Sequence, residues 1–558
     1  MRWRTRFALV SLVPLLASCA ERDASVAAVP AADGFADMNP DPNVFEARLV
    51  AREREVDIGP ETVRLLTFAD RVPGPEIRVK QGDRLLVHFE NQLPEGFATT
   101  VHWHGIEGAN ASDGTPTTQR PVEPGEVFTY DMRLPRPGIY WYHPHVRGAQ
   151  GTHSGLYGTI VVEDPDEQRL RELGVLPQLE RTLVLSDLGT YRGGPISVEV
   201  EDDFALMNGT EGARLLVNGH VLPSYEVPAG EGLRLRTVNA SITRYWRLSV
   251  VGHELLRVGG QGGLLDHARV EGGSANGSSE GGDVDVDLGY ARGEVLLAPG
   301  ERADIILVPR GAPGEVVTLR WEDHARGRHG MWMEDGAMVM GDAPDDGKRQ
   351  GVDVARFVIV EGSGDYWIEE GTPILAAVGR ATAPVAVSDQ ALRFEGERAT
   401  VLGETMDMLP DELGGWTHEA EFFIDGASWS HPSDHGGSDV PLAPTARKAR
   451  LGDTIVWEVR NETGMSHPFH LHGFSYQPVE FLEHDDGHDG SEKRDVRWSV
   501  DHVEFVDTTN IPAHTSLFFR VELRDPNGDG GALGRWMMHC HIVQHAEAGM
   551  MSELVVGP

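Results

Sequence analysis

Cysteine is nearly absent from this 558-residue sequence, which contains only Cys19 and Cys540. If the thiol of Cys19 is modified at the start of the mature chain, it cannot pair with Cys540, and no disulfide can form within one molecule. A fold held together by disulfides is then excluded. An exported protein that keeps one lone thiol is expected to use it chemically. The thiol in question is that of Cys540.

Basic residues are also scarce. The 49 lysines and arginines face 87 aspartates and glutamates, which gives a formal net charge of −38. Nucleic-acid binding needs a basic surface, so we exclude it. The acidic balance favours solubility and a weak attraction of cations. No stretch beyond the N-terminus is long and apolar enough to form a transmembrane helix.

Residues 1–19 have the pattern of an export signal. Three arginines at positions 2, 4 and 6 precede a short apolar run, which ends at L-A-S-C. This ending resembles the lipobox of bacterial lipoproteins, which implies a periplasmic or cell-envelope protein attached to the membrane only through a lipid on Cys19. Ordinary cleavage that leaves Cys19 free is the alternative. Residues 20–45 are rich in Ala, Asp and Pro and are predicted to be a tether.

Three segments of the chain are alike. Each has a glycine turn followed by an alternating strand, and they end at Asn91, Asn239 and Asn461. Alternation of apolar and polar residues is typical of half-buried strands. Repeats at domain-sized spacing, in a chain with 66 glycines and 34 prolines, predict duplicated all-β domains.

We therefore predict three β-sandwich domains, at 46–168, 176–362 and 398–558. The segment 363–397, with its Thr-Pro and Ala-Pro steps, is predicted to connect the last two domains. The Gly- and Ser-rich residues 272–283 are predicted to form an exposed loop of the second domain.

Histidine pairs of the form H-x-H occur four times among the 24 histidines, whereas about one would be expected by chance. The pairs are His102/His104, His143/His145, His470/His472 and His539/His541. All lie in the first and third predicted domains, and the last pair encloses Cys540. On an extended strand Cys540 points to one side while His539 and His541 point to the other. A thiolate with imidazoles is a ligand set that copper favours, so two neighbouring copper sites are predicted.

The four segments H-W-H-G, W-Y-H-P-H, H-P-F-H-L-H-G and H-C-H-I-V-Q-H-A-E-A-G-M resemble the copper-binding motifs of the multicopper oxidases, including the laccase and copper-tolerance branches. The resemblance implies three consecutive cupredoxin-like Greek-key β-sandwich domains and four copper ions. It implies that the type 1 copper is held by His467, Cys540, His545 and Met550. It implies that the type 2 copper is held by His102 and His470. It implies that the type 3 pair is held by His104, His143, His145, His472, His539 and His541.

Reduction of O2 to water consumes four protons, so a carboxylate near the copper cluster is expected. Asp113 resembles the family acid that follows H-W-H-G, although the dipeptide Asp-Gly also simply makes a turn. Many bacterial relatives carry a glutamate just before the last type 1 histidine, where this chain has Gln544, and glutamine cannot supply a proton. The residues expected to take part in catalysis are Cys540, His539, His541 and Asp113.

The electron donor is less defined by the sequence. Met331, Met333, Met338 and Met340 form two M-x-M pairs, and Met406 and Met408 form a third. Thioethers suit Cu(I), although methionines also fill irregular cores. We expect an oxidase, acting as a monomer, that couples one-electron oxidation of phenols, Cu(I) or Fe(II) to reduction of O2. The alternative is a copper-tolerance protein that chiefly binds Cu(I).

Overall fold

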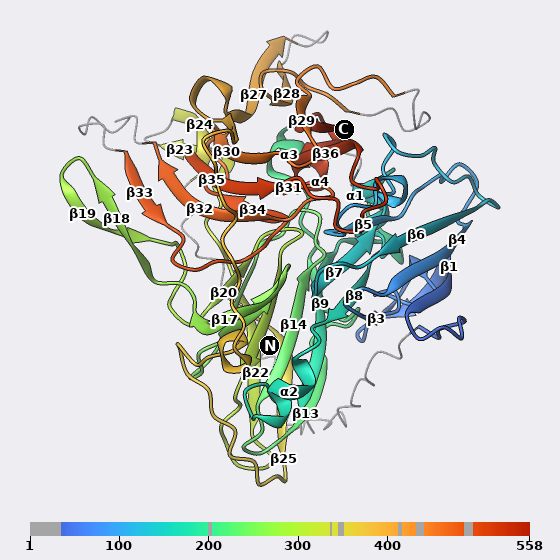
Figure 1. Ribbon diagram of the computed structural model, residues 1–558. Helices are drawn as coiled ribbons and strands as arrows, with labels where there is room; N and C mark the ends of the chain where they lie inside the picture. The colour runs from blue at the N-terminus through green and yellow to red at the C-terminus, as the bar shows by residue number, and fades with distance from the viewer. Residues whose placement is uncertain are drawn as a thin grey trace, which may run out of the picture.

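The computed structural model describes residues 35–198, 203–334, 337–343, 351–410, 416–430, 440–484 and 495–558 (Figure 1). Within them the chain is built almost entirely of β-strands, arranged as three cupredoxin-like sandwiches. The third domain lies across the top of Figure 1, with the first domain beside it and the second domain below. The predicted signal segment and Cys19 lie outside the described residues.

The first domain packs two four-stranded sheets, with orders β2-β1-β4-β6 and β3-β8-β7-β5. Alternation along the fourth strand buries Leu85, Val87 and Phe89 between them. The strands are β1 (Val44–Asp57), β2 (Thr62–Phe68), β3 (Ile77–Lys80), β4 (Arg84–Gln92), β5 (His102–His104), β6 (Val127–Arg133), β7 (Gly138–His143) and β8 (Gly158–Glu163).

The predicted tether, 20–45, extends too far. The amide of Phe35 donates to the carbonyl of Glu76, and its ring packs against the core of the first domain. β1 already begins at Val44. The last part of this segment is therefore folded onto the domain, because Phe35 finds an apolar contact there.

The second domain packs a six-stranded sheet, β12-β9-β14-β21-β16-β17, against a five-stranded one, β13-β25-β22-β15-β20. Its strands are β9 (Leu179–Leu188), β12 (Arg214–Val217), β13 (Ser224–Pro228), β14 (Leu233–Asn239), β15 (Trp246–Val250), β16 (Leu256–Gly260), β17 (Gly263–Val270), β20 (Val295–Leu297), β21 (Arg302–Leu307), β22 (Val316–Glu322) and β25 (Val352–Val360). Two further hairpins belong to it: β10 (Thr190–Tyr191) with β11 (Gly194–Pro195), and β23 (Arg328–Glu334) with β24 (Ala337–Ala343).

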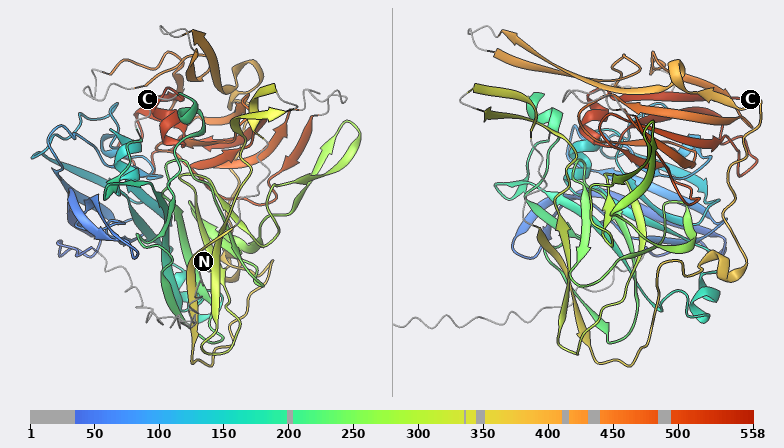
Figure 2. Two further views of the ribbon diagram at one scale, coloured as in Figure 1. Left: turned by 180° about the vertical axis from the view of Figure 1, so that it is seen from behind. Right: turned by 90° about the vertical axis from the view of Figure 1, so that its left-hand side faces the viewer.

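The third domain is built on the sheets β19-β18-β33-β32-β35-β30-β27-β28 and β29-β37-β36-β31-β34. The first of these sheets also includes β18 (Ser274–Ser279) and β19 (Gly282–Asp287) from the second domain. Its strands are β26 (Leu392–Phe394), β27 (Thr400–Pro410), β28 (Trp416–Ile424), β29 (Arg447–Arg450), β30 (Thr454–Asn461), β31 (His467–Leu471), β32 (Tyr476–Glu483), β33 (Val496–Ser499), β34 (Thr508–Ile511), β35 (Thr515–Glu522), β36 (Gly534–Cys540) and β37 (Met551–Gly557). Figure 2 shows the β23–β24 and β27–β28 hairpins projecting on the same side of the molecule.

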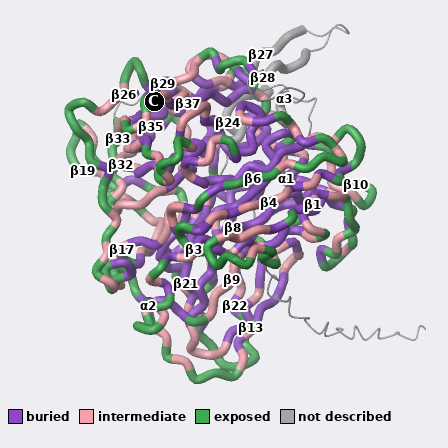
Figure 3. Tube along the Cα trace, turned by 45° about the vertical axis from the view of Figure 1, so that its right-hand side comes forward, coloured by how far each residue is buried: buried purple, intermediate pink, exposed green. Residues whose placement is uncertain are grey.

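The expectation of an exposed loop at 272–283 was wrong. Residues 272–283 are not a loop: β18 (Ser274–Ser279) and β19 (Gly282–Asp287) form a hairpin, and β18 pairs with β33 of the third domain. Backbone pairing with a strand more than 200 residues away stabilises this Gly- and Ser-rich stretch, although its side chains stay largely exposed (Figure 3). The segment 363–397 also includes β26, which pairs in parallel with β30.

Helices are few and short. They are η1 (Asn110–Ser112), α1 (Gly148–His153), α2 (Glu167–Glu172), α3 (Asp203–Asn208), η2 (Leu375–Val378), η3 (Gly396–Arg398) and α4 (Val543–Glu547). None of the helices in the described ranges is long or apolar enough to span a bilayer. α3, from the second domain, packs against α4, β23 and β28.

The asparagine that ends each repeat has the same structural role. Asn91, Asn239 and Asn461 are fully buried, and each side-chain amide donates to two or three backbone carbonyls of the adjoining loops. Each side-chain oxygen accepts the amide two residues further on. The repeated asparagine therefore fixes the loop that leaves the strand. In the third domain that loop leads directly to His467.

Replacing Asn461 by alanine is expected to destabilise the third domain. The substitution leaves the carbonyls of Met465, Ile511 and Pro512 without their donor, and each unsatisfied buried group costs about 1–3 kcal/mol. Urea unfolding measures the loss. Asn91→Ala is the matched control: it should destabilise the protein to a similar degree but leave the copper-thiolate absorption of Cys540 unchanged, whereas Asn461→Ala should weaken that absorption. Equal absorption in both variants would contradict this role of Asn461.

Candidate metal centres

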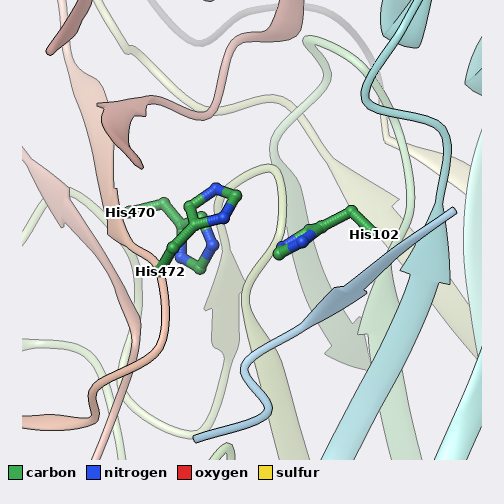
Figure 4. Close-up of side chains that lie close together, drawn as sticks. All are labelled: His102, His470 and His472. Atoms are coloured by element: carbon green, nitrogen blue, oxygen red, sulfur yellow. The ribbon is translucent and has the colours of Figure 1, made fainter. Parts of the chain in front are cut away.

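Two pairs of strands, from the first and third domains, bring the H-x-H histidines together. β5 pairs with β7 so that His102 lies opposite His143, and β31 pairs with β36 so that His470 lies opposite His539. Figure 4 shows the ring of His102 pointing across the domain interface toward the rings of His470 and His472. The rings of His102 and His472 are stacked, with centroids 4.1 Å apart.

Three groups of imidazoles at this interface have the geometry of metal sites. In each group the ring nitrogens lie within 4.8 Å of one another and all side chains are buried. The groups are His102/His470/His472, His104/His143/His541 and His145/His472/His539. All eight histidines that the resemblance assigns to types 2 and 3 therefore meet in one buried cluster, which we call the histidine cluster.

The hydrogen bonds of the histidine cluster leave ring nitrogens available for metal. On His102, His143 and His470, Nδ1 is hydrogen-bonded to the backbone oxygens of Asp113, Pro144 and Asp507, at 2.6, 2.8 and 2.9 Å. A proton on Nδ1 leaves the lone pair on Nε2. In the described part of the chain, those three Nε2 atoms are buried without a hydrogen-bond partner. Buried polar atoms without a hydrogen-bond partner are rare, and metal coordination accounts for these three. An imidazole that ligates a metal through one nitrogen usually donates a hydrogen bond to a protein oxygen through the other.

A second buried group lies on the other side of β36. The Cys540 Sγ atom is 3.4 Å from His467 Nδ1 and 3.9 Å from His545 Nδ1. Here the outer nitrogens are Nε2: that of His467 contacts Thr463 Oγ1 at 2.9 Å, and that of His545 contacts the Met207 carbonyl at 3.1 Å. The thiol and both Nδ1 atoms therefore converge on one point. We call these three residues the thiolate group.

Burial raises the pKa of the Cys540 thiol well above its usual range, and the nearby carboxylate of Glu404 acts in the same direction. The thiolate is thus unfavourable in this pocket unless a cation is present, and a bound metal supplies one. The Met550 side chain is fully buried in the same core, and the Met550 carbonyl accepts the Cys540 amide at 3.1 Å. The backbone of Met550 therefore lies beside that of Cys540, in the same core as the thiolate group.

Asp113 lies beside the histidine cluster. Its carboxylate oxygens are 3.1 and 3.2 Å from Nδ1 of His472, and Thr115 Oγ1 donates to Oδ2 at 3.1 Å. Burial raises the pKa of Asp113 to about 8, while the Thr115 hydrogen bond lowers it. A buried acid that is protonated near neutral pH is suited to proton donation. The Asp-Gly turn is also present, since Gly114 has a φ of +76° and a Cβ there would lie 1.8 Å from the Val101 carbonyl oxygen.

Gln544 does not serve as an acid at the histidine cluster or at the thiolate group. Its side-chain amide donates to the Val198 carbonyl and to Thr210 Oγ1, at 2.8 and 3.0 Å, and its oxygen accepts the Thr210 amide. These bonds tie α4 to the second domain. Gln544 therefore acts as an interdomain contact, whereas the Asp113 carboxyl contacts the histidine cluster directly.

Several residues at these sites were not singled out by the sequence. Asp507 lies 3.3 Å from His104 Nδ1 and 3.5 Å from His470 Nδ1, and Arg302 forms an ion pair with it. Thr463 and the Met207 carbonyl orient the imidazoles of the thiolate group. None lies in an H-x-H motif, and a backbone carbonyl leaves no trace in sequence.

The methionine pairs are described only in part. The same holds for the acidic residues 483–489 (E-H-D-D-G-H-D), which the sequence allows to be a solvated loop or a rim that attracts cations. The backbone of 331–334 and 337–340 lies in the β23–β24 hairpin and that of Met406 and Met408 lies in β27, but the methionine side chains lie outside the described residues. Most of 483–489 also lies outside them. The proposed Cu(I) role of the methionines thus stays a prediction.

Two family models, each described as multicopper oxidase, match this chain, one over residues 51–167 and the other over 416–558. The chain is similar to multicopper oxidase MmcO of Mycobacterium tuberculosis, with 27% identity over 91% of this chain and 86% of that protein. It is 23% identical to laccase-1 of Cryptococcus neoformans, over 87% of this chain and 76% of that protein. The solved multicopper oxidase of Campylobacter jejuni, a metallo-oxidase, has the same fold, with a TM-score of 0.67 and 22% identity over 95% of this chain and 94% of that one.

Proposed function

Because the chain belongs to the multicopper oxidase family and is thus a copper-dependent oxidoreductase that uses O2, we propose that it holds four copper ions and oxidises small one-electron donors, with Cu(I) preferred over phenols. The observation that carries the proposal is the pairing of a buried thiolate group with a buried histidine cluster on opposite sides of one strand, β36.

The residues that would hold copper follow from the geometry and the family resemblance together. His467, Cys540, His545 and Met550 would hold the type 1 copper, and His102 and His470 the type 2 copper. The type 3 pair would be held by His104, His143, His145, His472, His539 and His541. When bound, these ions supply one-electron oxidation at the thiolate and storage of the four electrons that O2 requires.

The protein connects and encloses the two sites. The backbone of Cys540 continues directly into His539 and His541, so the thiolate group and the histidine cluster are joined by a few covalent bonds. All these side chains are buried, which keeps bulk water away from both sites. Asp113, beside His472, is placed to hold a proton next to the cluster.

The covering of the thiolate group favours a small donor. Both imidazoles have no exposed surface, and the outer nitrogen of His545 is bonded to the Met207 carbonyl of α3. The buried carboxylate of Glu404 lies 3.6 Å from the outer nitrogen of His467. A flat phenol therefore cannot contact the ring edge of His467 or His545 directly. A metal ion needs no such contact, because a few ligand atoms near the surface are enough to bind it.

The test compares initial rates of oxygen uptake with Cu(I), Fe(II) and a simple phenol. We expect Cu(I) to give the highest kcat/KM. Substituting leucine for Met331, Met333, Met338 and Met340 should lower the Cu(I) rate by about 10-fold, corresponding to about 1.4 kcal/mol of lost interaction, because leucine has the size of methionine but no sulfur ligand. The phenol rate is the internal control and should stay within about 2-fold of the unsubstituted rate. Equal loss for both donors would contradict a Cu(I)-specific role.

A second candidate function is copper binding, with oxidase activity secondary to Cu(I) sequestration. The complete set of cluster histidines opposes it, since storage of copper requires no O2-reducing geometry. The oxygen-uptake experiment separates the two, because a sequestering protein would consume Cu(I) without proportional O2 consumption.

We further propose that the protein is exported and anchored by a lipid on Cys19, and that it acts as a monomer. The L-A-S-C sequence supports the anchor. Metabolic labelling with a radioactive fatty acid tests it, and Cys19→Ser should abolish the label.

A further inference from the structure

The second domain contributes none of the candidate copper ligands, yet one of its residues reaches the histidine cluster. Arg302, at the start of β21, is almost fully buried. Its Nε atom donates to the Ile139 carbonyl of the first domain at 2.7 Å, and its Nη1 atom lies 2.6 Å from Asp507 Oδ1 of the third. One guanidinium therefore touches all three domains. It lies between the two ranges that the family models match.

Asp507 faces two imidazoles of the histidine cluster. Its Oδ1 atom lies 3.3 Å from His104 Nδ1 and 3.5 Å from His470 Nδ1, and its carbonyl accepts from His470 at 2.9 Å. The two rings are stacked, with centroids 3.8 Å apart and planes 14° apart. Thr508 Oγ1 also donates to Oδ1, at 2.9 Å. The carboxylate is thus placed to accept the outer N–H of His104 and to hold His470 parallel to it.

Arg302 fixes the orientation of this carboxylate. The fork of its guanidinium binds both carboxylate oxygens, with Nη1 donating to Oδ1 and Nη2 to Oδ2. Arg302 Nη1 also lies 3.3 Å from His104 Nδ1. A protonated His104 Nδ1 can donate to the Asp507 carboxylate but not to the Arg302 guanidinium, which has no acceptor. Arg302 therefore acts on His104 through Asp507.

We propose that Arg302 and Asp507 are positioning residues for the three coppers of the histidine cluster, the type 2 copper and the type 3 pair. Through these two residues the second domain controls copper occupancy at the interface between the first and third domains. This inference rests on the proposed function. Buried ion pairs contribute little net stability compared with apolar residues of the same size. Carboxylates that hold the outer nitrogen of a metal-bound imidazole, by contrast, tune metal affinity and activity by about 10–100-fold.

The test is Arg302→Lys, with Arg257→Lys as its matched control. Arg257 also forms a buried ion pair between the second and third domains, with Glu504, but Glu504 contacts no histidine of the cluster in the described structure. Lysine keeps the charge in both variants and removes the two-point fork. Copper per chain is measured by elemental analysis, alongside the thiolate-to-copper absorption of Cys540 and oxygen uptake.

We expect Arg302→Lys to lose the cluster coppers selectively, so that copper per chain falls from four toward one while the Cys540 absorption is kept, and oxygen uptake falls about 10–100-fold. Arg257→Lys should keep all four. Asp507→Asn, which retains the shape but not the charge, should behave like Arg302→Lys. The inference is overturned if Arg302→Lys retains four coppers, if Arg257→Lys loses as many, or if the Cys540 absorption disappears together with the cluster coppers. A wild-type protein without four coppers would instead refute the proposed function.

Discussion

Cys540→Ser is expected to abolish the visible copper-thiolate absorption and to lower oxygen uptake by more than about 100-fold with every donor. Losing the outer partner of a metal ligand already costs about 10–100-fold, so losing the sulfur ligand itself should cost more. The sulfur is the atom on which His467 and His545 converge, and its own backbone leads to His539 and His541. Serine has nearly the same shape but is a poor ligand for copper at a soft site.

Ile542→Val provides the control for this substitution. Ile542 is fully buried, and its amide donates to the Cys540 sulfur at 3.4 Å, so the variant perturbs the same pocket without removing a ligand. It should cost about 0.5–1.5 kcal/mol of unfolding free energy. Its absorption and oxygen uptake should remain close to those of the wild type. A Cys540→Ser protein that stays coloured would contradict the assignment of the thiolate.

Asp113→Asn is expected to lower oxygen uptake by about 10²–10⁴-fold, the usual contribution of a positioned proton donor. The amide oxygen of asparagine can still accept the proton of His472 Nδ1, so copper per chain should not change. The carboxyl, unlike the amide, can release a proton. Retained copper with lost turnover is therefore the expected combination, and loss of copper would mean that Asp113 only holds the cluster together.

The pH dependence gives a second readout of Asp113. Because burial raises the pKa of this acid to about 8, it is protonated below that pH and loses its proton above it. Oxygen uptake should thus fall as pH rises through this pKa. The positive charge of bound copper favours the carboxylate, which places the falling limb at or below pH 8.

Thr115→Val identifies the group responsible for that limb. The Thr115 hydroxyl stabilises the ionised carboxylate, so removing it should raise the pKa of Asp113 and shift the falling limb to higher pH. Valine has the same shape as threonine, which makes the change in packing small. A limb that does not move would assign the pH dependence to another group.

The histidines that meet between the first and third domains could be picked out from sequence because each strand carries its own short motif. The alternation of β36 places Cys540 and the flanking histidines on opposite sides, whatever the rest of the fold does. The repeated asparagines were equally visible, since Asn91, Asn239 and Asn461 form the same local bonds.

The contacts between domains could not be predicted in the same way. Arg302 and Asp507 are 205 residues apart. The local sequence around each residue does not distinguish it from a charged residue in a surface ion pair. The Met207 carbonyl is a backbone atom that any residue would supply. β18, with the sequence S-A-N-G-S-S, lacks an apolar alternation, and its pairing with β33 holds it in place. These features depend on how the domains meet, which no local segment encodes.

The central claim is that copper occupies two sites on opposite sides of β36, one at the thiolate group and one within the histidine cluster. Anomalous diffraction at the copper absorption edge, from crystals of the copper-loaded protein, tests it most directly. We predict one peak beside the sulfur of Cys540 and three among the imidazoles that lie between the first and third domains. A single peak at Cys540 with no density within the histidine cluster, or peaks only on the surface, would contradict the account.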